Sequence, residues 1–391
     1  MNDHEVIGRH YRTGNPTRVR WAGRQITEVT TVDSCSPELW IAPGLLDPQV
    51  NGYGGIDFQQ DAVSLEELLL ATRQLARDGC GRYLLTLVTD EWGRLLRRLG
   101  QYRALRAQSL ELQAAVVGWH IEGPFLCAAP GFCGAHDPAL MIDPTPAHLQ
   151  ELRHVAGPDP LLLTIAPERT GALHLIPEAV RLGMRVSLGH TNASADILAE
   201  AVRSGARAFT HLGNGCPRDL DRHDNILWRV FETSGLIIGL IPDRIHVSPT
   251  LFRLIHRLFP AESIYYTTDA MAAAGAGPGH YRLGRLQLQV GADQVVRLPG
   301  SANFAGSALR PIDGVLRAAR MLDCPWRDVW DRAASGPAEL MGLTHGLKVG
   351  GPADFVHLDF SGEELVVQLP AITANPPLPS TPSTGRGPGP V

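Results

Sequence analysis

The chain has 391 residues, and a hydrophobic fraction of 44% is enough to bury a large core. A formal net charge of -5 gives no basic surface, so we expect neither nucleic acid nor a membrane as a partner. No signal-peptide core and no apolar stretch of about 18 residues occurs. The six cysteines are scattered through the chain, which favours reduced thiols and a cytoplasmic location.

Alternation of strands and helices dominates the chain after residue 41. Residues 19–32 alternate enough to predict a small pair of strands. Eight apolar runs then follow, most of them with a helical pattern behind them, at residues 41–49, 82–89, 115–120, 161–165, 185–190, 207–211, 236–241 and 264–268. Runs that are apolar on both faces indicate a parallel sheet buried on both sides. Eight such units predict a (β/α)8 TIM-like barrel, an α/β fold.

Additions to the barrel are expected at both ends of the chain. Residues 281–298 predict a hairpin that turns at Gly291–Asp293, and helices are expected at 307–322 and 326–341. Strands at 347–358 and 365–369 could pair with the amino-terminal strands as a small flanking β-domain. The predicted division is residues 1–41 (first part of the β-domain), 42–342 (barrel, with a hairpin insertion at about 280–299), 343–370 (second part) and 371–391 (disordered tail).

Residues 185–217 form one predicted βαβ unit in which each strand ends in a histidine, His190 or His211. Residues 191–194 (TNAS) offer turn and N-cap chemistry to the intervening helix, and Gly205 suits its carboxyl end. Adjacent parallel strands lie about 4.8 Å apart, so the two imidazoles can converge at the carboxyl edge of the sheet. Two histidines at strand ends have a structural role as often as a catalytic one. The residues at the other strand ends therefore have to distinguish the two roles.

Those other strand ends also carry metal-ligand chemistry. The third strand contributes Glu122, the eighth contributes Asp269, and the first places Gln49 and Asn51 beside them. Two imidazoles and one carboxylate make a three-ligand site with an open position, which is the catalytic pattern of zinc. The same set would accept iron(II) or another divalent ion. Such an ion lowers the pKa of a bound water and polarises a carbonyl, and Asp269 is placed to carry the proton.

Eight short stretches, in order, carry a resemblance to a known family. They are PGLLDPQVNGYGG, WHIEGPF, GAHDP, LGHTNA, THLGNGCP, IHVSP, TTDA and FAGSAL, between about Ala42 and Met341. In this order and at these spacings they resemble the N-acetylglucosamine-6-phosphate deacetylases of the amidohydrolase superfamily. Any one stretch is weak, and the ordered set is specific. The resemblance implies an amidohydrolase-type barrel with a small flanking β-domain.

The resemblance also implies roles for individual residues. Glu122, His190 and His211 would hold the metal, and Asp269 would act first as general base and then as general acid. His136 would bind the substrate and polarise the acetamide carbonyl. The other implied substrate contacts are Ala135, Asn214, Gly215, His246, Phe304, Ala305, Gly306 and, to the phosphate from a partner subunit, Arg222.

Departures from the family pattern bear on the metal and on the phosphate. Many amidohydrolases have His-x-His on the first strand and bind a second metal there, whereas this chain has Gln49 and Asn51. We therefore expect one divalent ion, zinc by preference or iron, with Gln49 near the metal's water. In the charged loop 218–225, Arg218 competes with Arg222 as the phosphate contact. Residues 241–245 depart from the expected glycine-bearing sequence.

The sequence thus predicts hydrolysis of N-acetylglucosamine 6-phosphate to glucosamine 6-phosphate and acetate, in amino-sugar catabolism, by a cytoplasmic homodimer. One alternative keeps the machinery and changes the substrate, to N-acetylgalactosamine 6-phosphate or to a cyclic amide. No lysine stands in the metal set to carry a carbamylated bridge, which disfavours the cyclic amide. A second alternative is a non-catalytic barrel that binds sugar phosphate. Such a barrel would be expected to have lost Asp269 or a ligand histidine, and both are present.

Overall fold

The computed structural model describes residues 3–299, 304–360 and 366–368. Its largest sheet has eight parallel strands in the spatial order β14-β13-β12-β11-β10-β9-β8-β5. Each strand therefore lies beside its neighbours in the chain, and the (β/α)8 fold class is confirmed. The strands are β5 (Leu45–Val50), β8 (Cys80–Val88), β9 (Val116–Glu122), β10 (Leu161–Ile165), β11 (Met184–Leu188), β12 (Ala208–Phe209), β13 (Ile237–Leu240) and β14 (Ile264–Tyr266).

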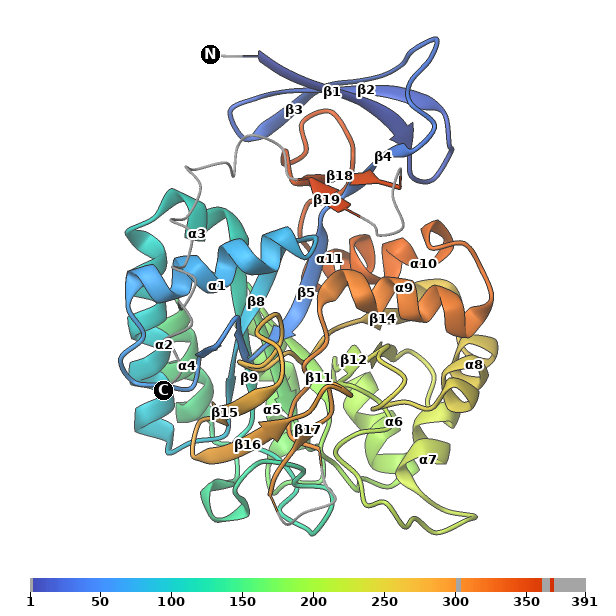
Figure 1. Cartoon of the computed structure of the whole chain (residues 1–391). Helices are drawn as coiled ribbons and strands as arrows, with labels where there is room; N and C mark the ends of the chain where they lie inside the picture. The colour runs from blue at the N-terminus through green and yellow to red at the C-terminus, as the bar shows by residue number, and fades with distance from the viewer. Residues whose placement is uncertain (1–2, 300–303, 361–365, 369–391) are drawn as a thin grey trace, which may run out of the picture.

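Helices surround this sheet (Figure 1). They are α1 (Leu65–Arg77), α2 (Trp92–Ala107), α3 (Leu110–Ala115), α4 (Pro146–Ala156), α5 (Ala172–Arg181), α6 (Ala195–Arg203), α7 (Ile226–Glu232), α8 (Pro249–Leu258), α9 (Pro311–Leu322), α10 (Arg327–Trp330) and α11 (Ser335–Met341). Within the predicted capping segment 191–194, Ser194 caps α6 by accepting a hydrogen bond from the backbone of Ile197. Among the residues described, no helix is long and apolar enough to cross a membrane.

The barrel closes between its first and last strands with few backbone contacts. Over the described residues β5 and β14 form no ladder, and the closure is one parallel bridge between Val50 and Ala270. Beside it, the Asn51 N–H donates to the Ala270 carbonyl at 2.7 Å. Side chains therefore have to supply part of what holds these two strands in register.

A second sheet of six strands caps the amino-terminal end of the barrel, at the top of Figure 1. Its order is β19-β18-β4-β1-β2-β3, so it combines both ends of the chain. The strands are β1 (Asp3–His10), β2 (Pro16–Ala22), β3 (Gln25–Thr31), β4 (Leu39–Pro43), β18 (Phe355–Asp359) and β19 (Val366–Gln368). The predicted pair in residues 19–32 is β2 and β3, and β1 was not predicted because its charged sequence shows little alternation.

The first barrel strand starts later than predicted. Residues 39–43 belong to β4 of the flanking sheet, and the chain enters the barrel only after Gly44. A side chain at Gly44 would meet the Asp354 carboxyl at 2.3 Å, so the crossing between the two sheets requires glycine. The domain boundaries at residues 42 and 342 stay predictions, and the tail 371–391 lies outside the described residues.

Of two local predictions after the barrel, one is confirmed and one was wrong. A hairpin turns at Gly291–Asp293, between the antiparallel strands β16 (Leu286–Val290) and β17 (Val296–Arg297). A second turn, at Gly284 with a φ of 58°, was not predicted and joins β15 (Gly279–Leu283) to β16. The helix expected at 326–341 is broken between α10 and α11. Pro337 explains the break, because its ring clashes with the carbonyl of residue 333 in a continuous helix.

Trp330 joins the barrel to the flanking sheet. Its side chain is fully buried, and its indole N–H donates to the Pro43 carbonyl of β4 at 3.0 Å. Replacement by alanine leaves a large cavity and an unpaired carbonyl, so we expect Trp330→Ala to lower the free energy of unfolding by about 3–5 kcal/mol. Chemical denaturation followed by circular dichroism measures this change. Leu110→Ala, at a side chain that is 71% exposed, is the control and should cost within about 0.5 kcal/mol. Equal losses in both variants would contradict the assigned role of Trp330.

Candidate metal and catalytic site

Four strand ends bring the predicted metal and catalytic residues together at the carboxyl end of the barrel. Glu122 is the last residue of β9, and His190, His211 and Asp269 follow β11, β12 and β14. The backbones of these last three residues are left-handed, with φ of 49°, 32° and 51°. Residues other than glycine seldom adopt this conformation, which costs on the order of 1–3 kcal/mol each and concentrates at functional sites. No pattern in the sequence indicates this backbone strain.

Glu122 lies at the centre of the group. Its Oε1 is 2.8 Å from His211 Nε2 and 3.4 Å from His190 Nε2, and its Oε2 is 3.8 Å from His136 Nε2. Glu122, His136 and His190 each offer one ligand atom within 4.8 Å of the others. The structure thus brings the three predicted ligands together and adds a third imidazole to them.

Hydrogen bonds to the far ring nitrogens distinguish His190 from His136. His190 Nδ1 lies 2.8 Å from the Phe132 carbonyl, which can only accept, so Nδ1 carries a hydrogen, and Nε2 is the nitrogen that faces Glu122 and is left to bind an ion. Metal-binding histidines are oriented in this way by a partner on the other nitrogen. His136 is arranged oppositely, because the backbone N–H of Thr89 donates to its Nδ1 at 3.4 Å and the Thr89 hydroxyl lies 2.8 Å away. Its Nε2 therefore carries the hydrogen and is a donor.

The charges of the group are mutually compensated. Burial raises the pKa of Glu122, but hydrogen bonds from His190 and His211 outweigh burial and hold it well below its usual range. Burial lowers the pKa of His211, but its hydrogen bond to Glu122 reverses the direction. Burial and the charge of His190 lower the pKa of His136 to about 3, so this ring is neutral. His211 Nδ1 is buried without a hydrogen-bond partner among the described residues. One carboxylate and imidazole nitrogens that lose their hydrogens on binding would fit a divalent ion.

Asp269 is held by the two amides of the first strand. Gln49 Nε2 and Asn51 Nδ2 donate to the same oxygen, Asp269 Oδ1, at 2.9 and 2.7 Å. Burial and the charge of Glu122 raise the pKa of Asp269 to about 7, against the lowering effects of His211, His246 and Asn51. A buried carboxyl with a pKa near neutrality suits a group that takes a proton and gives it back.

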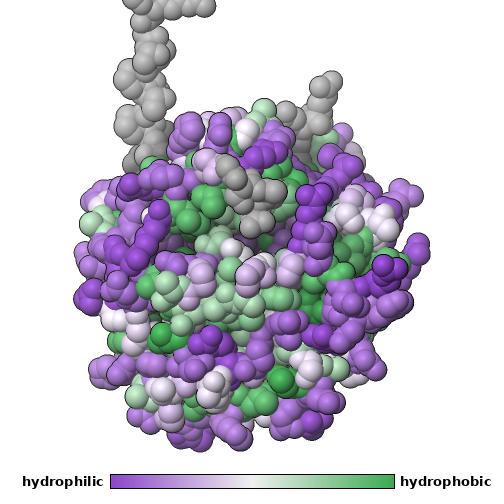
Figure 2. All heavy atoms as spheres, turned by 90° about the horizontal axis from the view of Figure 1, so that it is seen from below, coloured by the Kyte–Doolittle hydropathy of each residue, from purple (hydrophilic) through white to green (hydrophobic). Residues whose placement is uncertain are grey.

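A cavity of about 600 Å³ opens above these residues. Figure 2 views this end of the molecule, where hydrophobic and near-neutral residues cross the centre inside a hydrophilic rim. The predicted site residues that line the cavity are Glu122, Ala135, His136, His190, His211, Asn214, Gly215, His246, Asp269, Phe304 and Gly306. Ala305 lines a neighbouring cavity that shares His136. The structure therefore brings the predicted metal, catalytic and sugar-contacting residues to one place.

The two arginines predicted as candidate phosphate contacts lie in different places. Arg218 lines the cavity of its own chain, beside Asn214 and Gly215. Arg222 is exposed and lies outside the cavity lining, and its backbone carbonyl accepts from the Trp228 indole. Gly215 has φ of 61°, and a Cβ there would lie 2.8 Å from His190 Nδ1, so glycine at this position leaves room for the imidazole.

Sequence reasoning missed two residues that orient site histidines. Asp243 is buried, its Oδ2 is 2.5 Å from His246 Nδ1, and its Oδ1 accepts the backbone N–H of His246. The unexpected segment 241–245 thus supplies the partner that orients His246 toward Phe304, with ring centres 5.2 Å apart. The D-x-x-H spacing was a usable signal. Thr89, the partner of His136, is 47 residues away in sequence and left no local signal.

Comparisons with known proteins agree with this geometry. No family model matches the chain. N-acetylglucosamine-6-phosphate deacetylase of Danio rerio is 31% identical over 332 residues, which cover 82% of this chain and 80% of that protein. A solved structure of a mutant N-acetyl-D-glucosamine-6-phosphate deacetylase from Mycobacterium smegmatis, in complex with N-acetyl-D-glucosamine-6-phosphate, is 31% identical. It covers 88% of this chain and 91% of its own, with a TM-score of 0.79. The enzyme from Pasteurella multocida, at 23% identity and a TM-score of 0.82, supports the fold.

The barrel and its strand-end carboxylates and imidazoles define a metal-dependent hydrolase of the amidohydrolase type. Within that class, the chain belongs to the N-acetylglucosamine-6-phosphate deacetylase family. The predicted resemblance is confirmed, whereas the roles of individual residues stay predictions.

Glu122 tests the metal site. We expect Glu122→Gln, which keeps the shape and removes the charge, to weaken metal binding by at least about 100-fold, because even partners of ligands contribute about 10–100-fold. The metal content of dialysed protein, measured by mass spectrometry, reports this loss without any assay of activity. His256→Asn is the matched control, because His256 is largely buried and bonded to Phe252 and Tyr266 on the far side of the barrel wall. Full metal content in Glu122→Gln would exclude this residue from the ligand set.

Proposed function

We propose that this protein hydrolyses the acetamide of N-acetylglucosamine 6-phosphate to glucosamine 6-phosphate and acetate. The observation that carries the proposal is the meeting, in one cavity, of Glu122 and the strand-end histidines with Asp269. The names of the curated relatives supply the substrate. The cytoplasmic location, the homodimer and the absence of nucleic acid as a partner stay predictions.

The proposed ligands of one divalent ion are Glu122, His190 and His211, with zinc preferred over iron for this donor set. When bound, such an ion activates water and polarises a carbonyl. Gln49 and Asn51 are engaged with Asp269, which supports a single ion and leaves no second set of ligands on the first strand.

The protein's own groups divide the remaining work. The proposed role of His136, which is neutral and has its hydrogen on Nε2, is to donate to the acetamide oxygen and stabilise the negative charge that develops there. Asp269, with Oδ1 held by two amides, takes a proton from the attacking water. It then gives that proton to the sugar nitrogen as the carbon–nitrogen bond breaks and acetate leaves.

The phosphate end of the substrate is proposed to meet the loop after His211. Asn214 and the Gly215 N–H would contact the sugar phosphate, and His246 and the segment 304–306 would contact the sugar. Arg222 is proposed to act from a second copy in a homodimer, since it lies outside its own cavity. Arg218 is the alternative from within the same chain, because it lines that cavity. A guanidinium suits either position, since its planar fork pairs with phosphate oxygens.

Asp269→Asn tests the reaction. The amide cannot take up or return the proton, so we expect kcat for acetate release from N-acetylglucosamine 6-phosphate to fall by about 100- to 10,000-fold, while bound metal is unchanged. Acetate release by metal-loaded protein, in an enzyme-coupled assay, measures both forms. If the wild type releases no acetate, or if wild type and Asp269→Asn release it at the same rate, the proposal is wrong.

The phosphate contact is decided by two arginine variants. The arginine that pairs with phosphate should, on replacement by alanine, raise KM for the phosphorylated substrate by about 10- to 100-fold and leave the unphosphorylated substrate unaffected. Arg203→Ala, at a surface ion pair with Glu200, is the control. Mixing Arg222→Ala subunits with Asp269→Asn subunits tests the homodimer. If Arg222 acts on the site of the other copy, each mixed dimer contains one site with both residues intact, and activity returns on mixing. If Arg222 acts within its own chain, no site is intact. Two unchanged KM values would exclude both arginines.

A further inference from the structure

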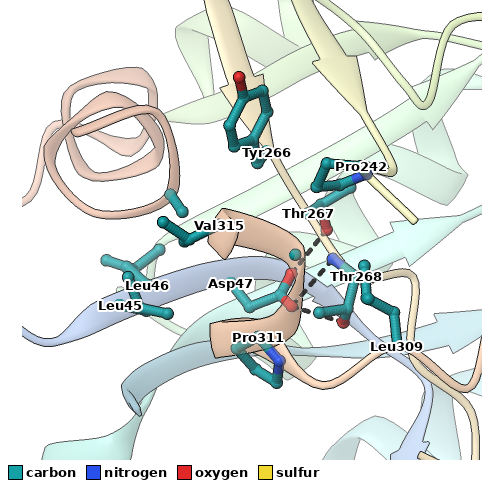
Figure 3. A pocket seen from close by; sticks show the side chains of 12 residues that line it. Leu45, Leu46, Asp47, Pro242, Tyr266, Thr267, Thr268, Leu309, Pro311 and Val315 are labelled. Atoms are coloured by element: carbon teal, nitrogen blue, oxygen red, sulfur yellow. Dashed lines mark hydrogen bonds between the residues drawn. The ribbon is translucent and has the colours of Figure 1, made fainter. Parts of the chain in front are cut away.

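Asp47 is a buried carboxylate of β5 that the proposed reaction does not use. It is 4% exposed and does not line the substrate cavity. Its Oδ1 accepts from the Gln49 N–H at 3.1 Å and from the Thr267 hydroxyl at 2.6 Å. Its Oδ2 accepts from the Thr268 N–H at 3.0 Å and from the Thr268 hydroxyl at 2.5 Å. Figure 3 shows the Asp47 carboxylate facing Thr267 and Thr268, with dashed lines to both, and we call these three residues the Asp47 clamp.

The Asp47 clamp lies where the barrel lacks backbone pairing. In the described residues, β5 and β14 share only the bridge between Val50 and Ala270. Three of the four hydrogen bonds of Asp47, those from Thr267 and Thr268, cross between the two segments and replace ladder bonds. Apolar side chains such as Leu309 and Val315 surround it, around a small cavity of about 20 Å³ (Figure 3). Hydrogen bonds to a charged group are stronger in such surroundings than in water.

The two segments joined by the clamp are those that orient the catalytic carboxylate. Gln49 is two residues after Asp47, and Asp269 directly follows Thr268. The Thr268 hydroxyl also accepts the Ala270 N–H at 3.0 Å, so the turn is held on both sides of Asp269. With β5 and the 267–270 segment in this register, the Gln49 and Asn51 amides reach Asp269 Oδ1. A shift of one residue in a strand would turn these amides to the opposite face.

The clamp requires a carboxylate. All four groups that face Asp47 are donors in this arrangement, and an ionised carboxylate accepts at both oxygens. An asparagine would keep the shape but present an N–H₂ group to the donors at Oδ2. One backbone N–H would then lose its acceptor, and the turn that carries Asp269 would have to move.

We propose that Asp47 is a positioning residue of the deacetylation reaction, which acts through Thr267, Thr268 and Gln49 to set the orientation of Asp269. This inference rests on the proposed function for its kinetic consequence. Its structural consequence, the contact between Gln49 Nε2 and Asp269 Oδ1, is independent of the substrate.

The experiment compares metal-loaded wild type, Asp47→Asn, Thr268→Val, the double variant and Thr268→Ser. Asp159→Asn is the matched control, because Asp159 is a largely buried carboxylate bonded to Trp119 and Arg106 before β10, at the opposite end of the barrel. For each protein, kcat, KM, bound metal and thermal unfolding are measured, and crystal structures of wild type and Asp47→Asn report the contact between Gln49 and Asp269.

We expect kcat of Asp47→Asn to fall by about 100-fold, since a displacement of about 1 Å at the reacting groups has that effect. KM and bound metal should not change, because the metal ligands lie on other strands. Thr268→Val should lower kcat in the same direction, Thr268→Ser should restore most of it, and the double variant should be no slower than Asp47→Asn alone. The control should lose stability without losing kcat.

Several outcomes would overturn the proposal. An unchanged kcat in Asp47→Asn, additive losses in the double variant, or a contact between Gln49 and Asp269 that persists in the variant crystal would each do so. If Asp47→Asn does not fold, equal kcat in Thr268→Val and Thr268→Ser overturns it instead. An inactive wild type would contradict the proposed function. In that case the contact between Gln49 and Asp269 in the two crystal structures alone tests the positioning role of Asp47.

Discussion

The site depends on buried negative charge that is neutralised by imidazoles. Glu122 and Asp269 are both removed from water, and two carboxylates so placed repel each other unless donors and cations surround them. The barrel supplies those partners from different strands, with His190 and His211 on Glu122 and the amides of Gln49 and Asn51 on Asp269. The strained backbones at three strand ends aim these side chains inward, and the surrounding barrel has to hold them there.

The sequence was sufficient for the parts of the molecule that repeat or that carry distinctive chemistry. The eight apolar runs predicted the barrel because parallel strands are buried on both faces, and strand-end residues such as Glu122 and His211 meet because parallel strands end at one edge. It failed where a single residue decides the outcome. Pro337 breaks a predicted helix, Gly284 adds a hairpin turn that was not predicted, and Thr89 fixes the tautomer of His136 from 47 residues away. None of these effects has a periodic signal.

The comparisons and the geometry carry different parts of the conclusion. Relatives at about 30% identity over four fifths of the chain establish the family. The hydrogen bonds orient two of the histidines differently, which no comparison of names provides. His190 Nδ1 donates to a backbone carbonyl, whereas His136 Nδ1 accepts and its Nε2 carries the hydrogen. The different hydrogen bonds explain why the three imidazoles of the cluster need not all be ligands of a metal ion.

The flanking sheet has a consequence for how the chain is made. Its inner strand β4 pairs with β1 on one side and with β18 on the other, and β18 lies more than 300 residues later in the chain. On the ribosome, the first 43 residues emerge long before their partner, so one edge of β4 stays open while the whole barrel is synthesised. Completion of this sheet is therefore a late event, and a chain that stops before residue 355 keeps an unpaired strand edge beside an otherwise finished barrel.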